Sequence, residues 1–149
     1  MRLSLRPGAS LYDALVGALA GAGVANASMT LLAASSATSL LHRSAGSGAP
    51  SGRGLYRTHL GGARILDLRQ RHIGQGRCGG ALVHCHAAFC DERGEPLGGH
   101  IIAQTTILGP LPVPVLVTAL DGIELRATYD AETNLRLLQP HGAQDHDAA

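Results

Sequence analysis

The sequence predicts an α+β fold in which a mostly antiparallel β-sheet packs against one or two helices. One observation is a clear helical pattern near the start of the chain, from about residue 11 to residue 20. The other is a series of short segments with strand character, two pairs of which are typical of hairpins because a polar turn containing glycine separates them. The 149 residues are the length of one domain, which we expect to cover residues 1–140 and to be followed by a flexible tail, 141–149.

The predicted helix has a start signal and a stop signal. Ser10 followed by Asp13 resembles a capping box, in which side-chain oxygens accept the unpaired N–H groups of the first turn. Apolar residues then recur at helical spacing from Leu11 to Ala20, and Gly21-Ala22-Gly23 ends the pattern. We expect the apolar face of this helix to cover the sheet.

Strand character recurs along the rest of the chain. The expected strands before and after the central hairpin are Ala25 to Ala34, Arg64 to Leu68 and Leu135 to Leu138. The segment from Ser35 to His42 is ambiguous, whereas the glycine-rich stretches Arg43 to Gly54 and Arg69 to Arg77 are predicted to be loops.

Three prolines at alternate positions between residues 110 and 114 indicate an edge strand, because alternate residues of a strand direct their N–H groups to the same side. A polyproline segment that crosses to a neighbouring subunit is the other possibility. Val115 to Leu120 and Ile123 to Tyr129 flank the turn Asp121-Gly122 and are predicted to pair as a hairpin, before a turn at Asp130 to Asn134.

The most informative stretch runs from residue 79 to residue 103. On a strand, His84 and His86 share one face, with Cα atoms about 6.6 Å apart. A three-residue loop closed by Asp91 and Glu95 would place His100 directly opposite His86, with Cβ atoms about 5 Å apart. A two-residue loop would put His100 on the other face, and a bulge at the two preceding glycines could also change its side.

Three imidazoles on one face favour a transition-metal site, because neutral imidazole suits Zn²⁺, Ni²⁺, Cu²⁺ and Fe²⁺. Three protein ligands leave a coordination position open, as in catalytic zinc sites. We therefore take His84, His86 and His100 as candidate ligands of zinc or another divalent transition metal. The alternative is a polar surface patch, or a stacked cluster in a trimer channel, without metal. Cys85 alternates with the histidines and is expected to be a core residue on the opposite face.

Two blocks of this stretch, L-V-H-C-H-A-A-F and D-E-R-G-E-P-L-G-G-H-I, resemble the histidine signature of the PPC domain (plant and prokaryote conserved domain). That signature is H-x-H, an acidic turn with glycine, and G-G-H. The opening L-R-P-G-A-S-L-Y-D-A-L and the late D-A-E-T-N-L-R-L-L also fit the family, so the resemblance spans roughly residues 3 to 140. It implies a compact PPC-like domain that forms a homotrimer, with a metal on the three histidines in some bacterial members.

Two functions remain open. The resemblance implies a stand-alone, bacterial-type protein that binds metal. It also implies a regulatory or DNA-associated role, which the plant PPC proteins suggest; in those proteins the DNA contact comes largely from AT-hooks. Arg43 to Gly54 lacks the Arg-Gly-Arg-Pro core of an AT-hook. The alternative is a small metal-dependent hydrolase or lyase that uses the open position, although no catalytic base, P-loop or nucleophile elbow can be assigned.

A cupin also carries H-x-H and a later histidine, but its third histidine lies on a separate motif well downstream. In this sequence the third histidine, His100, falls in the next strand of the same hairpin. The spacing therefore favours a PPC-like domain over a cupin.

Composition limits the partners. Twelve Arg and Lys against eleven Asp and Glu give a net charge of +1, which is low for a dedicated DNA-binding protein. Aromatic residues make up 3% of the chain, so the core must be built from small aliphatic side chains, and oligomerisation offers a second place to bury apolar surface.

The cysteines and the first 41 residues indicate in which cellular compartment the protein is expected. Three cysteines cannot all pair and show no C-x-x-C spacing, which favours free thiols and a cytoplasmic protein. Residues 7–41 hold few charges, but Pro7, Gly8 and Asp13 interrupt them, so neither a signal peptide nor a membrane span is expected.

Overall fold

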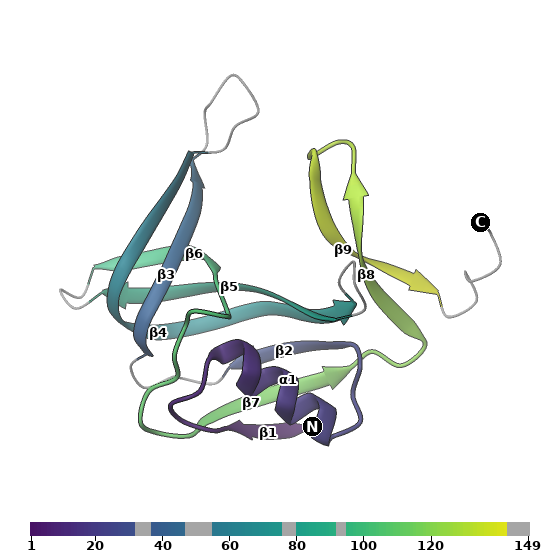
Figure 1. Ribbon diagram of the computed structural model, residues 1–149, viewed down its shortest axis with the longest axis horizontal. Coiled ribbons are helices and arrows are strands. Elements are labelled where there is room, and N and C mark those ends of the chain that lie inside the picture. Colours follow the sequence, from purple (N-terminus) through teal and green to yellow (C-terminus); the bar gives the residue numbers. More distant parts are fainter. Residues whose placement is uncertain (32–36, 47–54, 76–79, 92–94, 143–149) are drawn as a thin grey trace.

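The computed structural model describes residues 1–31, 37–46, 55–75, 80–91 and 95–142. Within these ranges the chain forms one helix, α1 (Leu11–Gly21), and nine strands joined in one mostly antiparallel sheet. The predicted α+β class is therefore confirmed, with one helix (Figure 1). In chain order the strands are β1 (Arg2–Leu5), β2 (Ala27–Leu31), β3 (Ala37–Gly46), β4 (Leu55–Gln75), β5 (Ala81–Asp91), β6 (Pro96–Ile101), β7 (Val113–Ala119), β8 (Ile123–Asp130) and β9 (Leu135–Gly142).

The order of strands in the sheet is β1-β7-β2-β4-β3-β6-β5. Because β4 pairs with β5 as well as with β3, the strands β4, β3, β6 and β5 close into a ring. The antiparallel ribbon β8–β9 is joined to the ring by a single parallel register pair, Gln75 with Arg126. Figure 1 shows this ribbon and the far ends of β3 and β4 extending away from α1 as two arms.

The helix begins and ends where its signals predict. The Asp13 N–H donates to Ser10 Oγ at 3.0 Å, and the Ser10 hydroxyl donates to the Asp13 carboxylate at 2.6 Å. The bond from the Asp13 N–H to Ser10 is the one expected of a capping box. The cap is a variant because the Asp13 carboxylate accepts from the Ser10 hydroxyl and not from a backbone N–H. At the other end Gly23 adopts a positive φ of 69°, which ends the helix at low steric cost.

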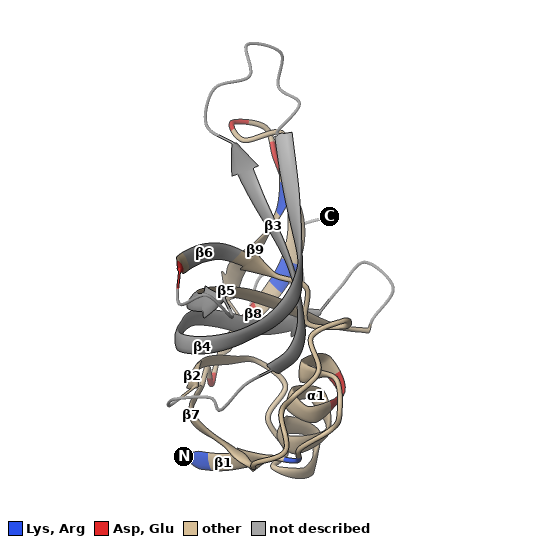
Figure 2. Ribbon diagram, turned by 90° about the vertical axis from the view of Figure 1, so that its left-hand side faces the viewer, with Lys and Arg blue, Asp and Glu red and all other residues tan. Residues whose placement is uncertain are grey.

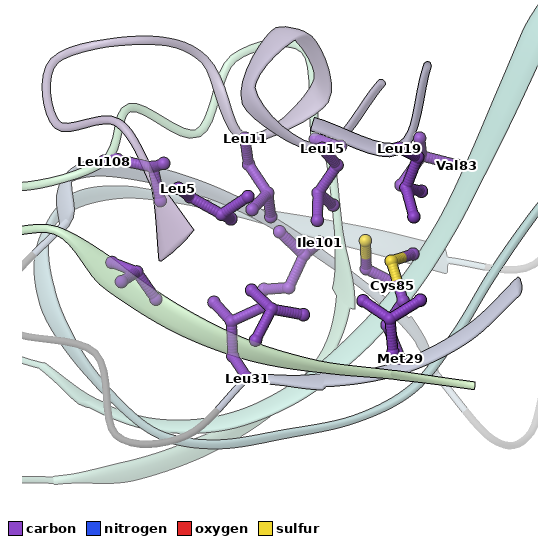
Figure 3. Close-up of a cluster of buried hydrophobic side chains, with 14 of the residues drawn as sticks. Leu5, Leu11, Leu15, Leu19, Met29, Leu31, Val83, Cys85, Ile101 and Leu108 are labelled. Atoms are coloured by element: carbon purple, nitrogen blue, oxygen red, sulfur yellow. The ribbon is translucent and has the colours of Figure 1, made fainter. Parts of the chain in front are cut away.

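The core lies between α1 and the sheet. One stripe of the helix buries Leu11, Leu15 and Leu19, each 1% exposed or less. In Figure 3 these side chains point toward Ile101 and Cys85 of the β5–β6 pair. Burying each leucine contributes about 1.5–3 kcal/mol, so this stripe holds the helix over the ring of strands. The other fully buried residues of large volume are Leu5, Met29, Ile101, Val113 and Val115.

Strand β4 differs most from the prediction. A short strand at residues 64–68 and a loop at 69–77 were expected, but Leu55–Gln75 is one strand of 21 residues. Its neighbours β2, β3 and β5 supply hydrogen-bonding partners along both edges, which overrides the weak local strand propensity of its glycines and arginines. The start of the predicted loop at residue 43 is also wrong, because β3 continues to Gly46; residues 47–54 lie outside the described ranges.

The proline-rich strand is not an edge of the sheet. Strand β7 lies between β1 and β2, with Pro114 opposite Ser4 in the register. The prediction that this proline-rich segment forms an edge strand is therefore wrong. The edge position belongs to β1, which the sequence did not predict. The predicted hairpin of β7 with β8 is also wrong, because both edges of β7 are already paired and β8 pairs with β9. The Asp121-Gly122 turn is confirmed, with Gly122 at φ 73°.

Two other boundaries differ. The sequence also predicts that the second strand of the histidine hairpin extends through residues 105–108, but β6 ends at Ile101. The N–H groups of Thr105 and Thr106 instead bond to the Ile102 carbonyl. The final strand was predicted to end at Leu138, but β9 runs to Gly142 and so includes the first two residues of the expected tail. Residues 143–149 of the expected tail lie outside the described ranges.

The predicted turn from Asp130 to Asn134 is confirmed and joins β8 to β9. The Thr133 hydroxyl donates to Asp130 Oδ2 at 2.6 Å, and this bond lowers the pKa of the Asp130 carboxyl. Asn134 closes the turn at φ 54°, a conformation that asparagine tolerates. Over the described ranges, no helix reaches the length and apolarity that crossing a bilayer would require.

Candidate metal centre

The pairing of β5 with β6 places His86 directly opposite His100. Cys90 pairs with Pro96 in the same register, which is the register of a three-residue loop closed by Asp91 and Glu95. The loop residues 92–94 lie outside the described ranges. The ladder runs without interruption through Gly98 and Gly99, so no bulge shifts His100 to the other face. The predicted register is confirmed.

Burial alternates along β5 as the spacing predicts. Val83, Cys85 and Ala87 are buried at 6%, 0% and 8% exposure, and they face the helix side of the sheet. Between them, His84 is half-buried and His86 is exposed. The core face and the histidine face of the strand are therefore distinct, and Cys85 belongs to the core as expected.

The three imidazoles converge. The ring centroids of His84 and His86 are 4.9 Å apart, those of His84 and His100 are 5.0 Å apart, and those of His86 and His100 are 5.4 Å apart. One ligand nitrogen from each ring can be chosen so that all three lie within 4.8 Å of one another. The three predicted ligands are thus brought together by two adjacent strands.

The spacing of the nitrogens fits a tetrahedral ion after a small adjustment. Two nitrogens each bound to one zinc ion lie about 3.4 Å apart, since the Zn–N distance is about 2.1 Å. The widest pair in the cluster must therefore approach by about 1.4 Å at most, which small rotations of the side chains can provide. The residues present fit a divalent transition metal held by three imidazoles.

No carboxylate joins this cluster among the residues that the structure describes. Strand β5 carries no charged residue from Ala81 to Ala88. Among the parts of the chain that Figure 2 colours, α1 carries a red acidic segment and β1 a blue basic one. Glu124 forms an ion pair with Arg126 at 2.5 Å on β8. Asp130 and Glu132 lie in the β8–β9 turn.

Two further residues lie beside the cluster in the strand register. His72 on β4 is the register partner of His84, and Arg43 on β3 is the register partner of His100. Both fall in segments that were predicted to be loops, so the sequence pattern did not connect them with the histidines. Their placement depends on strand pairing between distant parts of the chain, which no local pattern reports.

His141 is not part of the cluster. His141 was expected in the tail, but it lies in β9 opposite Glu124. Its Nε2 atom is buried and has no hydrogen-bond partner among the described residues. His146 lies outside the described ranges.

Comparisons with solved structures define the fold. The chain superposes on a metal-containing protein from Archaeoglobus fulgidus with a TM-score of 0.72, at 19% identity over 93% of this chain and 91% of that one. A plant- and prokaryote-conserved (PPC) protein from Pyrococcus horikoshii gives a TM-score of 0.64, at 15% identity over 93% and 90% of the two chains. A candidate DNA-binding protein from Bacteroides thetaiotaomicron gives 0.68, at 17% identity over 93% and 89%.

These likenesses cover nearly the whole of each chain, so the domain has a PPC-like fold, as the histidine signature implied. No protein-family model and no curated protein sequence matches the chain. The fold class is thereby defined at low sequence identity, whereas the role of the histidine cluster rests on its own geometry.

The two faces of β5 predict different costs of substitution in protein freed of metal with a chelator. Cys85→Ala removes a fully buried sulfur and should lower the free energy of unfolding by about 1 kcal/mol or more. His86→Ala changes an exposed side chain and should alter it by less than about 0.5 kcal/mol. Chemical denaturation measures both values, and a larger loss for His86→Ala would contradict the assignment of the faces.

Proposed function

We propose that this PPC-fold protein binds one divalent transition metal, zinc by preference, through His84, His86 and His100, and serves a regulatory or DNA-associated role. The observation that carries the proposal is the convergence of three imidazole nitrogens within 4.8 Å on one face of a hairpin. Each ligand is on a strand, so the protein backbone holds the set together before a metal arrives.

The donor set supports the choice of metal. Three neutral imidazoles suit zinc, which accepts tetrahedral sites with nitrogen ligands and has no geometric demand of its own. The similar protein from Archaeoglobus fulgidus is described as containing a metal, without a statement of which one. Other divalent ions of the same series compete for such a site, so zinc is the preferred ion rather than the exclusive one.

A role in association with DNA is supported by the neighbours in fold. Proteins from Ralstonia eutropha and Bacteroides thetaiotaomicron that share the fold are both described as candidate DNA-binding proteins. The net charge of +1 does not provide the electrostatic attraction on which DNA affinity mainly depends. We therefore propose that this chain acts with other partners on DNA, in the cytoplasm, rather than as an independent sequence reader.

A metal-dependent hydrolase or lyase is the second candidate. The observation in its favour is that three ligands leave a position open on a face where His86 is exposed. A bound metal would supply Lewis acidity at this place. No carboxylate of the described residues lies in the cluster to act as a general base, so the geometry supports metal binding more directly than catalysis.

We also propose that the protein is a homotrimer with one metal site per subunit. Beyond the resemblance to PPC domains, the support is unburied apolar surface on the strands and on the segment before β7. Five large apolar side chains there are 42% to 58% exposed, and burying them between subunits would supplement an aromatic-poor core. These residues are Leu111, Leu116, Ile123, Tyr129 and Leu135.

Metal content should follow the three histidines. Protein purified without an affinity tag and supplied with zinc should hold one ion per chain, measured by elemental analysis after dialysis. His84→Ala, His86→Ala and His100→Ala should each reduce the affinity by more than about 100-fold, because the loss of a ligand costs more than the 10- to 100-fold typical of outer-shell changes.

Two matched variants serve as controls. His141→Ala removes a histidine outside the cluster and Cys85→Ala removes a thiol on the opposite face, so both should keep the metal. Stoichiometric metal in the triple histidine variant would refute the proposed ligand set.

The oligomeric state gives a separate test of the assembly. Light scattering coupled to size exclusion should give three times the chain mass of 15.3 kDa at micromolar concentration. Substitution of Tyr129 and Leu135 by serine should weaken the trimer if the β8–β9 arm contributes to the interface. A monomer of the unmodified protein at this concentration would contradict the trimer.

DNA binding by the isolated protein should be weak and without sequence preference. At physiological salt the dissociation constant for random duplexes should be no tighter than about 10⁻⁶ M, the range of non-specific binding. Fluorescence anisotropy with a set of unrelated duplexes measures this. Nanomolar, sequence-selective affinity of this chain alone would overturn the expectation of an accessory role.

A further inference from the structure

We propose that the free edge of β1 and the groove between β1 and α1 bind an extended acidic segment of a partner protein, which adds to the sheet as one further strand. The groove shares no residue with the candidate metal centre, so this binding site does not depend on the metal. Its supports are the unpaired backbone groups of β1, the hollow beside them and the charges at this edge.

Strand β1 has a free edge. Among the strands that the structure describes it pairs with β7 alone, and Figure 1 shows it at the outer side of the sheet, next to α1. The Val117 N–H donates to the Met1 carbonyl at 2.8 Å, and the Met1 nitrogen donates to the Val117 carbonyl at 2.6 Å. Because bonded and non-bonded pairs alternate along an antiparallel ladder, the N–H and C=O groups of Arg2 and Ser4 point away from β7. They are available to a further strand.

A hollow of about 480 Å³ lies along this edge, between β1 and one side of α1. On that side the helix presents only small residues, Ala14, Gly17 and Ala18, because its leucines point into the core. The volume is within the range of roughly 300–1,000 Å³ that is usual for ligand sites. An extended segment bonded to β1 would place every second side chain in this hollow, which is the arrangement of peptide recognition by strand addition.

The charges at this edge favour an acidic segment. Arg2 lies on β1 and Arg6 lines the hollow, and both are exposed. Neither arginine forms an ion pair with a carboxylate of the described residues. Asp13, the acid that also lines the hollow, accepts the hydroxyl of Ser10. Carboxylates opposite the two arginines on an added strand would therefore form cross-strand pairs of opposite charge.

A second copy of β1 is a poorer occupant of the edge. Antiparallel pairing of two β1 strands about Ser4 would place Arg2 of each copy opposite Arg6 of the other. Like charges directly opposite each other destabilise a sheet, and charged residues are a general means by which edge strands avoid pairing with copies of themselves. The edge is thus suited to an acidic partner rather than to self-association.

The register specifies a probe. A strand opposite residues 2–6 should be acidic at its first and last positions, which lie across from the two arginines. It should be apolar at the second and fourth, which share the helix side with Leu3 and Leu5. The peptide G-E-V-T-V-E-G has this pattern. Fluorescence anisotropy of the labelled peptide with the whole protein should show saturable binding, with a dissociation constant below about 1 mM.

Two altered peptides test the mode of binding. G-K-V-T-V-K-G replaces both acids by lysine and should bind at least about fivefold more weakly, because it places like charges opposite the arginines. Methylation of the backbone nitrogen of the central threonine in the acidic peptide removes the donor to the Ser4 carbonyl. It should also weaken binding at least about fivefold.

Gly17→Leu tests the hollow. A Cβ at Gly17 meets no atom within 4 Å, and leucine is the better helix former, so the variant should fold and keep its melting temperature. Its side chain occupies the hollow and should weaken the acidic peptide at least about fivefold. Gly21→Leu is the matched control, because Gly21 is equally open and ends the same helix outside the hollow. It should bind as the unmodified protein does.

Arg6→Glu tests the charge. It should narrow the preference for the acidic peptide over the lysine peptide by at least about threefold. Arg136→Glu makes the same change of charge on β9, away from the hollow, and should leave the preference unchanged.

Each contrary outcome refutes a definite part of the proposal. No saturable binding up to about 1 mM, or equal affinity for the acidic and lysine peptides, would overturn the acidic partner. Unchanged affinity in Gly17→Leu would overturn the placement in the hollow. A smaller assembly for Gly17→Leu than for Gly21→Leu, measured by light scattering without peptide, would show that this edge joins copies of this chain and would overturn the partner segment.

Discussion

The register between β5 and β6 is the constraint on which the candidate site depends. Cys85 pairs with Ile101, and both are fully buried beneath the helix. A slip of one residue would expose Ile101 and turn His100 toward the core. The slip would lose the roughly 1.5–3 kcal/mol of stability that burial of the isoleucine side chain contributes. It would also add the free-energy cost of burying an imidazole that lacks hydrogen-bond partners. The packing of the core thus determines which residue faces His86.

The helix and the ring of strands give this register a rigid setting. Leu15 and Leu19 of α1 press on the core face of the hairpin (Figure 3), and β4 and β3 hold its outer edges by hydrogen bonds. The histidines therefore project from paired strands rather than from loops. Such placement restricts the motion of the ligands and lowers the entropy that metal binding would have to remove.

Local features of the sequence were sufficient for the helix and for the histidine hairpin. Both depend on residues that are close together in the chain. For the helix these are the cap at Ser10 and the helical spacing, and for the hairpin they are the alternation of His84 with Cys85 and the length of the turn. Pairing between strands that are distant in sequence could not be predicted in this way. The existence of β1, the full length of β4 and the interior position of β7 all depend on such pairing. For the same reason, the positions of His72 and Arg43 next to the cluster could not be predicted.

Anomalous diffraction from crystals of the zinc-loaded protein, measured on both sides of the zinc absorption edge, tests the central claim most directly. The account predicts one anomalous peak per chain, about 2.1 Å from one nitrogen of each of His84, His86 and His100. A peak elsewhere on the chain, or a map without a peak between these three imidazoles, would contradict it.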